Sequence, residues 1–403
     1  MLRRLLPFLF LAACSRPAPS GAPPRAEFLL VAGDSTYWVT SGPAGVKVRG
    51  SPIVLARYGG RFHELYLADD DHSYYDALLV GQTIYSRDLI TGDSVAVFTD
   101  TLVDRVASRY AADHPDESPL DADEDVADQP RVSATSDVSL LDVHGPFLSI
   151  EYHADTRERP RPGFHTTWRS VIDLRVGHPV PLSSVVGPEE AARVIARARG
   201  SYRSLLDSAR AGEGALGPIV DLVLSQVTFD ERSFQLADLH GGPAVEFAGR
   251  IAGRRDGHGA LPLPPIPVDS GNWWSEVRPT LPTDSDTGSV RWVRPDYTLL
   301  ARVDTTDSVA AVALVDSARH AFPVGQVQTP VRRVYWLDRP AIDSTTRSAL
   351  DRAFNDASLY DENARVAVRR ASPGVARFHP AALVDAHPRP AARRFERRRS
   401  TRP

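Results

Sequence analysis

Short apolar segments separated by glycine- and aspartate-containing turns recur along the first hundred residues of this 403-residue chain. Residues 28–32 and 36–40 flank Gly33-Asp34-Ser35, and residues 53–58 and 62–67 flank Gly59-Gly60-Arg61. Runs of this length, joined by turns of this composition, are typical of antiparallel hairpins. The pattern therefore predicts that much of the chain forms antiparallel β-sheet.

Longer segments extend this prediction beyond the first hundred residues. Residues 139–143 and 147–153 flank His144-Gly145, and residues 164–176 alternate between two faces, with His165, Thr167 and Arg169 on one of them. Helices are predicted at residues 101–111, at residues 188–211, and from Asp343 or Ser344 to about Asp356. The fold class is therefore predicted to be α+β, with mostly antiparallel β-sheet modules and a few packed helices.

A chain of this length is expected to contain two or three domains. Shifts in composition suggest the following division: a signal peptide at 1–13, a proline-rich tether at 14–26, a β-rich module at 27–112, an acidic linker at 113–130, an α+β module at 131–270, a linker at 271–287, a C-terminal α+β module at 288–380 and an arginine-rich tail at 381–403.

Charge and cysteine content exclude several classes of protein. The net charge of -4 gives no general case for nucleic-acid binding. A single cysteine excludes an intramolecular disulfide framework and a zinc site built from several thiolates. No apolar run approaches the roughly 20 residues that a membrane-spanning helix needs. The arginine-rich tail is either a solubilising segment, a site for acidic lipid headgroups or a partner for the acidic linker.

The N-terminus has the features of an export signal. Arg3 and Arg4 precede the short apolar stretch at residues 5–13, and small residues lead to Cys14, the only cysteine in the chain. Leu11-Ala12-Ala13-Cys14 resembles the bacterial lipobox, which implies lipid attachment at Cys14 and cleavage of the leader before it. Ser15, in the position after the cysteine, resembles outer-membrane sorting in an organism that has an outer membrane.

Residues 133–268 resemble the extracytoplasmic domain of RsiV-like, lysozyme-responsive anti-sigma factors and of some peptidoglycan deacetylases. Three segments carry the resemblance: an early strand at residues 148–152, a turn at residues 162–166, and a hairpin and loop at residues 172–185. The helix from Pro188 and a late proline-rich stretch at residues 263–268 follow in the expected order. The resemblance implies an envelope-facing α+β module for binding or sensing, and it transfers no catalytic residue.

One group of polar side chains is a candidate ligand site. If residues 147–155 pair with residues 164–176 as a hairpin, Glu151, His153 and His165 come close together on one face. The connecting loop adds Arg157 and further arginines. The group is either a ligand patch or metal site, or a pair of surface histidines beside a solvated loop. We predict Glu151, His153, His165 and Arg157 as ligand-binding residues, with no catalytic residue, no metal ligand and no cofactor.

Three other motifs have both a chemical and a structural interpretation. Gly33-Asp34-Ser35 could place Ser35 as the nucleophile of a GDSL-like esterase, but the same tripeptide at Gly92-Asp93-Ser94 indicates turn chemistry. Asp69-Asp70-Asp71-His72 could bind a cation or form a solvated turn. Trp273-Trp274 could stack on a sugar or form part of a domain interface.

Together these observations predict an exported lipoprotein, anchored to the cell envelope through acylated Cys14, with a non-catalytic binding or sensing role. Its expected partners are the lipid bilayer and an envelope protein or glycan, and nucleic acid is not among them. The alternative is an envelope esterase or hydrolase that uses Ser35.

Overall fold

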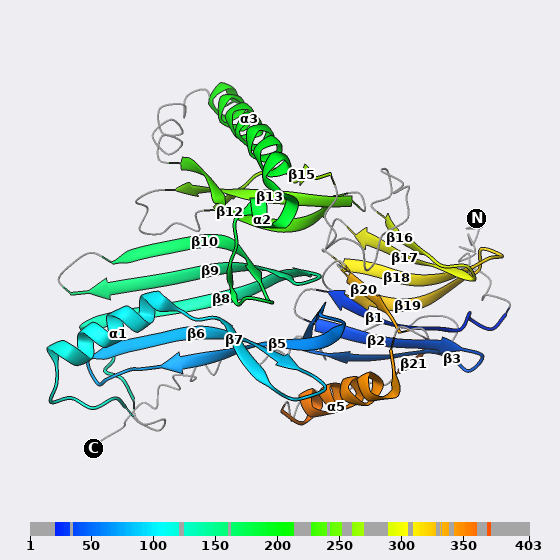
Figure 1. Ribbon diagram of the computed structural model, residues 1–403, viewed down its shortest axis with the longest axis horizontal. Helices are drawn as coiled ribbons and strands as arrows, with labels where there is room; N and C mark the ends of the chain where they lie inside the picture. Colours follow the sequence, from blue (N-terminus) through cyan, green and yellow to red (C-terminus); the bar gives the residue numbers. More distant parts are fainter. Residues whose placement is uncertain are drawn as a thin grey trace, which may run out of the picture.

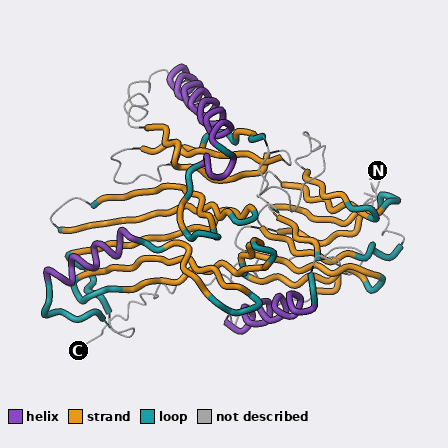
Figure 2. Tube along the Cα trace, in the orientation of Figure 1, coloured by secondary structure: helices purple, strands orange, loops and turns teal. Residues whose placement is uncertain are grey.

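A computed structural model confirms the predicted α+β class, with antiparallel sheets that dominate over a few helices (Figures 1 and 2). The structure describes residues 21–32, 35–120, 125–159, 163–212, 227–239, 242–251, 260–269, 289–304, 309–327, 331, 333–337, 342–360 and 369–371. These residues form four sheets, named A to D below. Among the described helices, none is both long and apolar enough to cross a membrane.

Sheet A combines strands from the two ends of the chain. In spatial order it contains β20 (Arg333–Trp336), β1 (Ala26–Ala32), β2 (Ser35–Gly42), β3 (Gly45–Ser51) and β21 (Arg369–Ala371). Sheet D contains β16 (Ser289–Val293), β17 (Tyr297–Asp304), β18 (Val309–Asp316) and β19 (Ala321–Val327). Figure 1 shows sheets A and D side by side at one end of the molecule, with α5 (Ser344–Tyr360) beneath sheet A.

Strand β1 of sheet A is buried on both faces and is apolar at nearly every position. Phe28 and Leu30 of β1 pack against sheet D, in one core with Leu299 and Leu314. The alternate residues of β1 pack on the other face, where the core includes Leu350 and Phe354 of α5. A strand buried on both faces has a nearly continuous apolar sequence, as β1 does.

Sheet B is the largest sheet and holds the middle of the chain. In spatial order it contains β11 (His178–Pro179), β10 (Phe164–Asp173), β9 (Phe147–Glu158), β8 (Val132–His144), β6 (Ala77–Asp88), β5 (Arg61–Asp71) and β4 (Val54–Tyr58), with β7 (Ser94–Phe98) paired to β6. Gly59 and Gly60 both have positive φ, as the two-residue turn between β4 and β5 requires. All pairs are antiparallel except β6 with β8.

Helix α1 (Thr101–Asp113) lies on one face of sheet B. It begins at Asp100, whose Oδ1 accepts hydrogen bonds from the backbone N–H groups of Leu102 and Val103. The buried Asp100 also accepts a hydrogen bond from the hydroxyl of Tyr152 on β9. The helix comes so close to β6 that a Cβ on Gly81 would lie 3.3 Å from Cβ of Val103.

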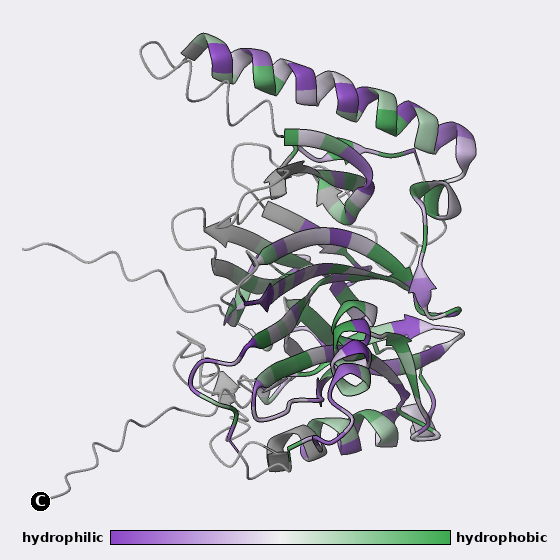
Figure 3. Ribbon diagram, turned by 90° about the vertical axis from the view of Figure 1, so that its left-hand side faces the viewer, coloured by the Kyte–Doolittle hydropathy of each residue, from purple (hydrophilic) through white to green (hydrophobic). Residues whose placement is uncertain are grey.

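Sheet C covers the other face of β9 and β10, and α3 packs on sheet C (Figure 1). Sheet C contains β12 (Val227–Leu239), β13 (Gly242–Ile251), β14 (Ala260–Pro262) and β15 (Ile266–Pro267). The short α2 (Leu182–Val186) leads into α3 (Pro188–Gly212), and both pack in one core with sheet C and with Phe147 and Val171 of sheet B. Hydrophobic and hydrophilic residues alternate along α3 in Figure 3, as expected for an amphipathic helix on a sheet.

Most predicted elements are confirmed, but strand pairing joins segments that the sequence analysis assigned to different modules. Strand β1 of the 27–112 module pairs with β20 of the 288–380 module. Strand β6 of the first module pairs in parallel with β8 of the 131–270 module. Composition marks where the chain is polar and loop-like, and it carries no information on which distant strands pair.

The acidic linker is held against the β5–β6 region where the structure describes it. The backbone N–H of Leu120 donates to the carbonyl of Ser73, and that of Ala127 donates to the carbonyl of Tyr75. Residues 113–120 and 125–130 therefore run beside the turn that precedes β6.

Candidate functional site

The predicted hairpin that brings the candidate ligand residues together is confirmed. Strands β9 and β10 pair so that Glu151 lies opposite Arg169, His153 opposite Thr167 and Asp155 opposite His165. Because alternate residues of a strand share a face, all six side chains lie on the same side of the hairpin. We call these six residues the polar row.

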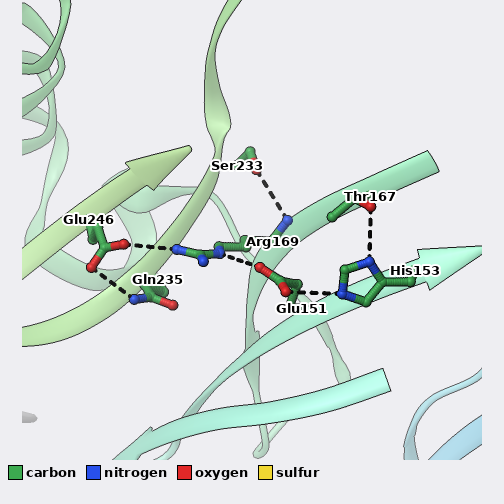
Figure 4. Close-up of polar contacts among 7 residues, drawn as sticks. All are labelled: Glu151, His153, Thr167, Arg169, Ser233, Gln235 and Glu246. Atoms are coloured by element: carbon green, nitrogen blue, oxygen red, sulfur yellow. Dashed lines mark hydrogen bonds and ion pairs between the residues drawn. The ribbon is translucent and has the colours of Figure 1, made fainter. Parts of the chain in front are cut away.

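The polar row is linked by hydrogen bonds from one end to the other, and Figure 4 shows the part that runs from Arg169 through Glu151 and His153 to Thr167. Nε2 of His153 lies 3.0 Å from Oε1 of Glu151, and its Nδ1 lies 2.9 Å from Oγ1 of Thr167. The same hydroxyl lies 3.3 Å from Nε2 of His165. Nδ1 of His165 lies 2.7 Å from Oδ1 of Asp155. Each imidazole is thus placed between a carboxylate and the Thr167 hydroxyl.

Arg169 joins the polar row to sheet C. Its Nε donates to Oε2 of Glu151 at 2.6 Å, and its Nη1 donates to Oε1 of Glu246 on β13 at 2.9 Å. The other oxygen of Glu246 accepts a hydrogen bond from Nε2 of Gln235 on β12. The backbone N–H of Arg169 also donates to Oγ of Ser233. Figure 4 shows Arg169 extended between the two carboxylates.

The side chains that join the two sheets are largely shielded from water. Relative exposure is 19% for Glu151, 16% for Arg169 and 19% for Glu246. Burial by itself would raise the pKa of Glu151, but the hydrogen bond and charge of Arg169, together with His153, outweigh it and lower that pKa. Glu151 is therefore an ionised hydrogen-bond acceptor at neutral pH.

Three of the four predicted ligand residues lie in the hydrogen-bonded polar row, and the fourth, Arg157, does not. Glu151, His153 and His165 share the polar row, where both oxygens of Glu151 are engaged by neighbours. Arg157 lies two residues beyond Asp155 on the same face of β9 and is exposed to solvent. The hydrogen-bonded row does not include Arg157.

Several side chains that complete this site are not among the predicted ligand residues. Arg169 and Thr167 were assigned to the correct face, and strand alternation was the signal that could have identified them. Ser233, Gln235 and Glu246 come from the β12–β13 hairpin, and nothing in the local sequence indicates that this hairpin packs against β10. Their contribution depends on how sheet C docks on sheet B.

The acidic motif at residues 69–72 has a structural role in the sheet. Oδ1 of Asp69 accepts a hydrogen bond from Gln82, and Oδ2 of Asp70 accepts one from Thr83. These adjacent aspartates lie on opposite faces of β5. Among the residues that the structure describes, no three histidine, cysteine or acidic side chains are grouped as they would be around a metal ion.

Ser35 lies in a β-hairpin. It is the first residue of β2 and pairs with Ala32, the last residue of β1, while Gly33 and Asp34 lie outside the described residues. The second copy of the tripeptide behaves in the same way, because Ser94 is the first residue of β7. This agreement favours turn chemistry for both copies.

Several predicted features lie outside the described residues. They are the lipid-attachment residue Cys14, the Trp273-Trp274 pair with its surrounding linker at 271–287, and the arginine-rich tail at 381–403.

Comparison with known proteins gives a distant structural neighbour. No protein-family model matches the chain, and no curated protein matches its sequence. The chain is similar to the crystal structure of a member of the DUF3298 family from Bacteroides fragilis, with 11% sequence identity and a TM-score of 0.29. The match covers 52% of this chain and 94% of that one. A likeness this remote assigns no function, so the resemblance of residues 133–268 to the RsiV-like domain remains a prediction.

Proposed function

We propose that this protein is a lipid-anchored component of the bacterial cell envelope with a non-catalytic binding or sensing role. The observation that carries the proposal is the tetrapeptide Leu11-Ala12-Ala13-Cys14, in which the sole cysteine of the chain follows a short apolar leader. The proposed anchor is a set of acyl chains on Cys14, each held in the bilayer by about 0.8 kcal/mol per buried methylene.

The segment after Cys14 suits a tether. Residues 15–26 contain four prolines and no large apolar residue, which favours an extended chain. Twelve extended residues reach up to about 40 Å. The first strand, β1, begins at Ala26, so the folded body follows the tether directly. In this arrangement the body is held near the membrane and can meet an envelope protein or glycan.

The polar row is the proposed contact region for such a partner. Its histidines are partly accessible, with relative side-chain exposures of 29% for His153 and 17% for His165. Asp155 and Arg157, near the loop that connects β9 to β10, are exposed to solvent and offer charges of both signs. Polar groups of this kind, fixed on paired strands, suit recognition of a polar partner.

Processing at Cys14 tests the anchor. The Cys14→Ala chain, expressed in a bacterial host, should keep its leader and incorporate no fatty acid. Ser15→Ala is the matched control, because it changes the neighbouring residue and should be lipidated normally. Mass spectrometry of the N-terminal peptide and membrane fractionation report both results. Normal cleavage and membrane retention of the Cys14→Ala chain would refute the proposal.

A further inference from the structure

Two imidazole nitrogens of the polar row point at the same atom. Nδ1 of His153 and Nε2 of His165 lie 2.9 and 3.3 Å from Oγ1 of Thr167. The opposite nitrogen of each ring faces a carboxylate, Glu151 for His153 and Asp155 for His165. The two inward nitrogens therefore lie close to each other, because each is within hydrogen-bond distance of the same hydroxyl oxygen.

The carboxylates determine which nitrogens carry hydrogen. An ionised carboxylate can only accept a hydrogen bond, so Nε2 of His153 and Nδ1 of His165 are the donors. In two neutral rings the inward nitrogens then both present lone pairs to the Thr167 hydroxyl. That hydroxyl has one hydrogen and can donate to only one of them. When both rings are neutral, one of the two inward nitrogens therefore has no hydrogen or cation to bind at the Thr167 hydroxyl.

A proton or a bound cation could occupy that position, and the surroundings favour a metal ion. Histidines that bind a metal usually donate their other ring N–H to a carboxylate or carbonyl, which fixes the ring and raises its basicity. Both rings have such a carboxylate here. Asp137 of β8 lies directly opposite His153 and is exposed, so a further oxygen donor is close to the same face.

We propose that His153 Nδ1 and His165 Nε2 bind a divalent transition-metal ion of the class that imidazole prefers, such as Zn²⁺, Ni²⁺ or Cu²⁺. Zinc–nitrogen bonds are about 2.0–2.1 Å long, so the ion would lie between the two inward nitrogens, in place of their contacts with the Thr167 hydroxyl. Water molecules complete the coordination. The inference deepens the proposed binding role, on which it rests, by naming the class of ligand that this face accepts.

Metal titration of the full chain tests the proposal. The chain is made as Cys14→Ala, so that its only thiol cannot bind the ion and the result does not depend on anchoring. Zn²⁺ binding by calorimetry is compared with that of the same chain carrying His153→Asn and His165→Asn. The matched control is His178→Asn, which removes an exposed histidine from β11 at the opposite end of β10.

The double variant should lose one bound Zn²⁺ per chain, or bind it at least tenfold more weakly, while the His178→Asn chain binds like its parent. Electron paramagnetic resonance of the Cu²⁺-loaded parent should show coupling to imidazole nitrogen that the double variant lacks. Equal stoichiometry and affinity in the parent and the double variant would overturn the proposal. Far-UV circular dichroism verifies folding, and His165→Asn alone replaces the double variant if that chain has unfolded. A failed metal test leaves lipidation at Cys14 intact, so the two proposals fail separately.

Discussion

Sheet A and the junction between sheets B and C are held together by different forces. Sheet A is enclosed by apolar side chains on both faces, with sheet D on one side and α5 on the other. The junction has an apolar core around Phe147 and Val171, but it is also joined by Arg169 between two carboxylates and by backbone N–H groups that donate to two buried serine hydroxyls.

This difference between an apolar core and a polar junction indicates which part of the molecule responds to pH and to bound ions. Apolar burial is non-directional and does not depend on the charge state of any side chain. A bridge of the form carboxylate–guanidinium–carboxylate depends on geometry and on ionisation. We therefore expect the apolar core between sheets A and D to act as a pH-independent frame, and the junction to change with pH, with bound ions and with single polar substitutions.

The largest loss in the free energy of unfolding should come from a substitution in the apolar core between sheets A and D. Phe28 is fully buried between sheets A and D, where its ring meets Trp336 edge-on at 5.2 Å. Phe28→Ala should lower the free energy of unfolding by about 3–5 kcal/mol, because it leaves a cavity in a packed core. Chemical denaturation at several pH values checks this, and the loss should be the same at each. A loss that varied with pH would contradict the comparison.

The next largest effect should come from the bridge. Arg169→Met keeps the length of the side chain but leaves Glu151 and Glu246 without their shared donor. We expect a loss of about 2–3 kcal/mol in the free energy of unfolding, the range for hydrogen bonds to charged groups. Arg61→Met is the matched control, since its pair with Asp88 is half exposed and such pairs are worth about 0–1 kcal/mol. Equal losses in the two variants would show that Arg169 is no bridge.

A smaller effect should come from a neutral hydrogen bond across the same junction. Oγ of the fully buried Ser149 accepts the backbone N–H of Leu236 at 3.0 Å. Ser149→Ala leaves that N–H without its acceptor and should cost about 1–2 kcal/mol. Amide hydrogen exchange should become faster at Leu236 while amides of β1 keep their protection. Unchanged exchange at Leu236 would mean that this contact does not hold sheet C in place.

The smallest effect should depend on pH. The folded-state pKa of Glu151 lies below its usual 4.5, so its contribution to stability is complete above that pH and is lost as the pH falls through the lowered value. Glu151→Gln keeps an acceptor for Arg169 but removes the charge, and should cost about 1 kcal/mol or less at neutral pH. The difference between wild type and variant should shrink as the pH falls below 4.5. A difference that stays constant would contradict the assigned role of Glu151.

Local sequence signals were sufficient to predict many of the helices and strands. They also predicted three of the six residues of the polar row, namely Glu151, His153 and His165. Gly59-Gly60 marks a two-residue turn, and Asp343 accepts the backbone N–H of Thr346 at the start of α5, as its side chain suggested. The alternation of residues 164–176 predicted the face that His165 shares with His153. Each of these signals acts over a few residues, where turn geometry and side-chain period determine the outcome.

Contacts between distant segments could not be predicted in the same way. The pairing of β1 with β20 and the bridge from Arg169 to Glu246 join positions far apart in the chain. They depend on how whole sheets pack, and many apolar strands of similar length could satisfy the same burial. The convergence of two imidazoles on Thr167 likewise follows from side-chain geometry, which strand alternation alone does not give.

Lipid anchoring at Cys14 is tested most directly by intact mass measurement. The full-length chain is expressed in a bacterial host, and the protein is purified from the membrane and cytosolic fractions. We expect a lipid-modified species whose first residue is Cys14, recovered with the membrane. An unmodified chain that still begins at Met1 and is recovered from the cytosol would contradict it.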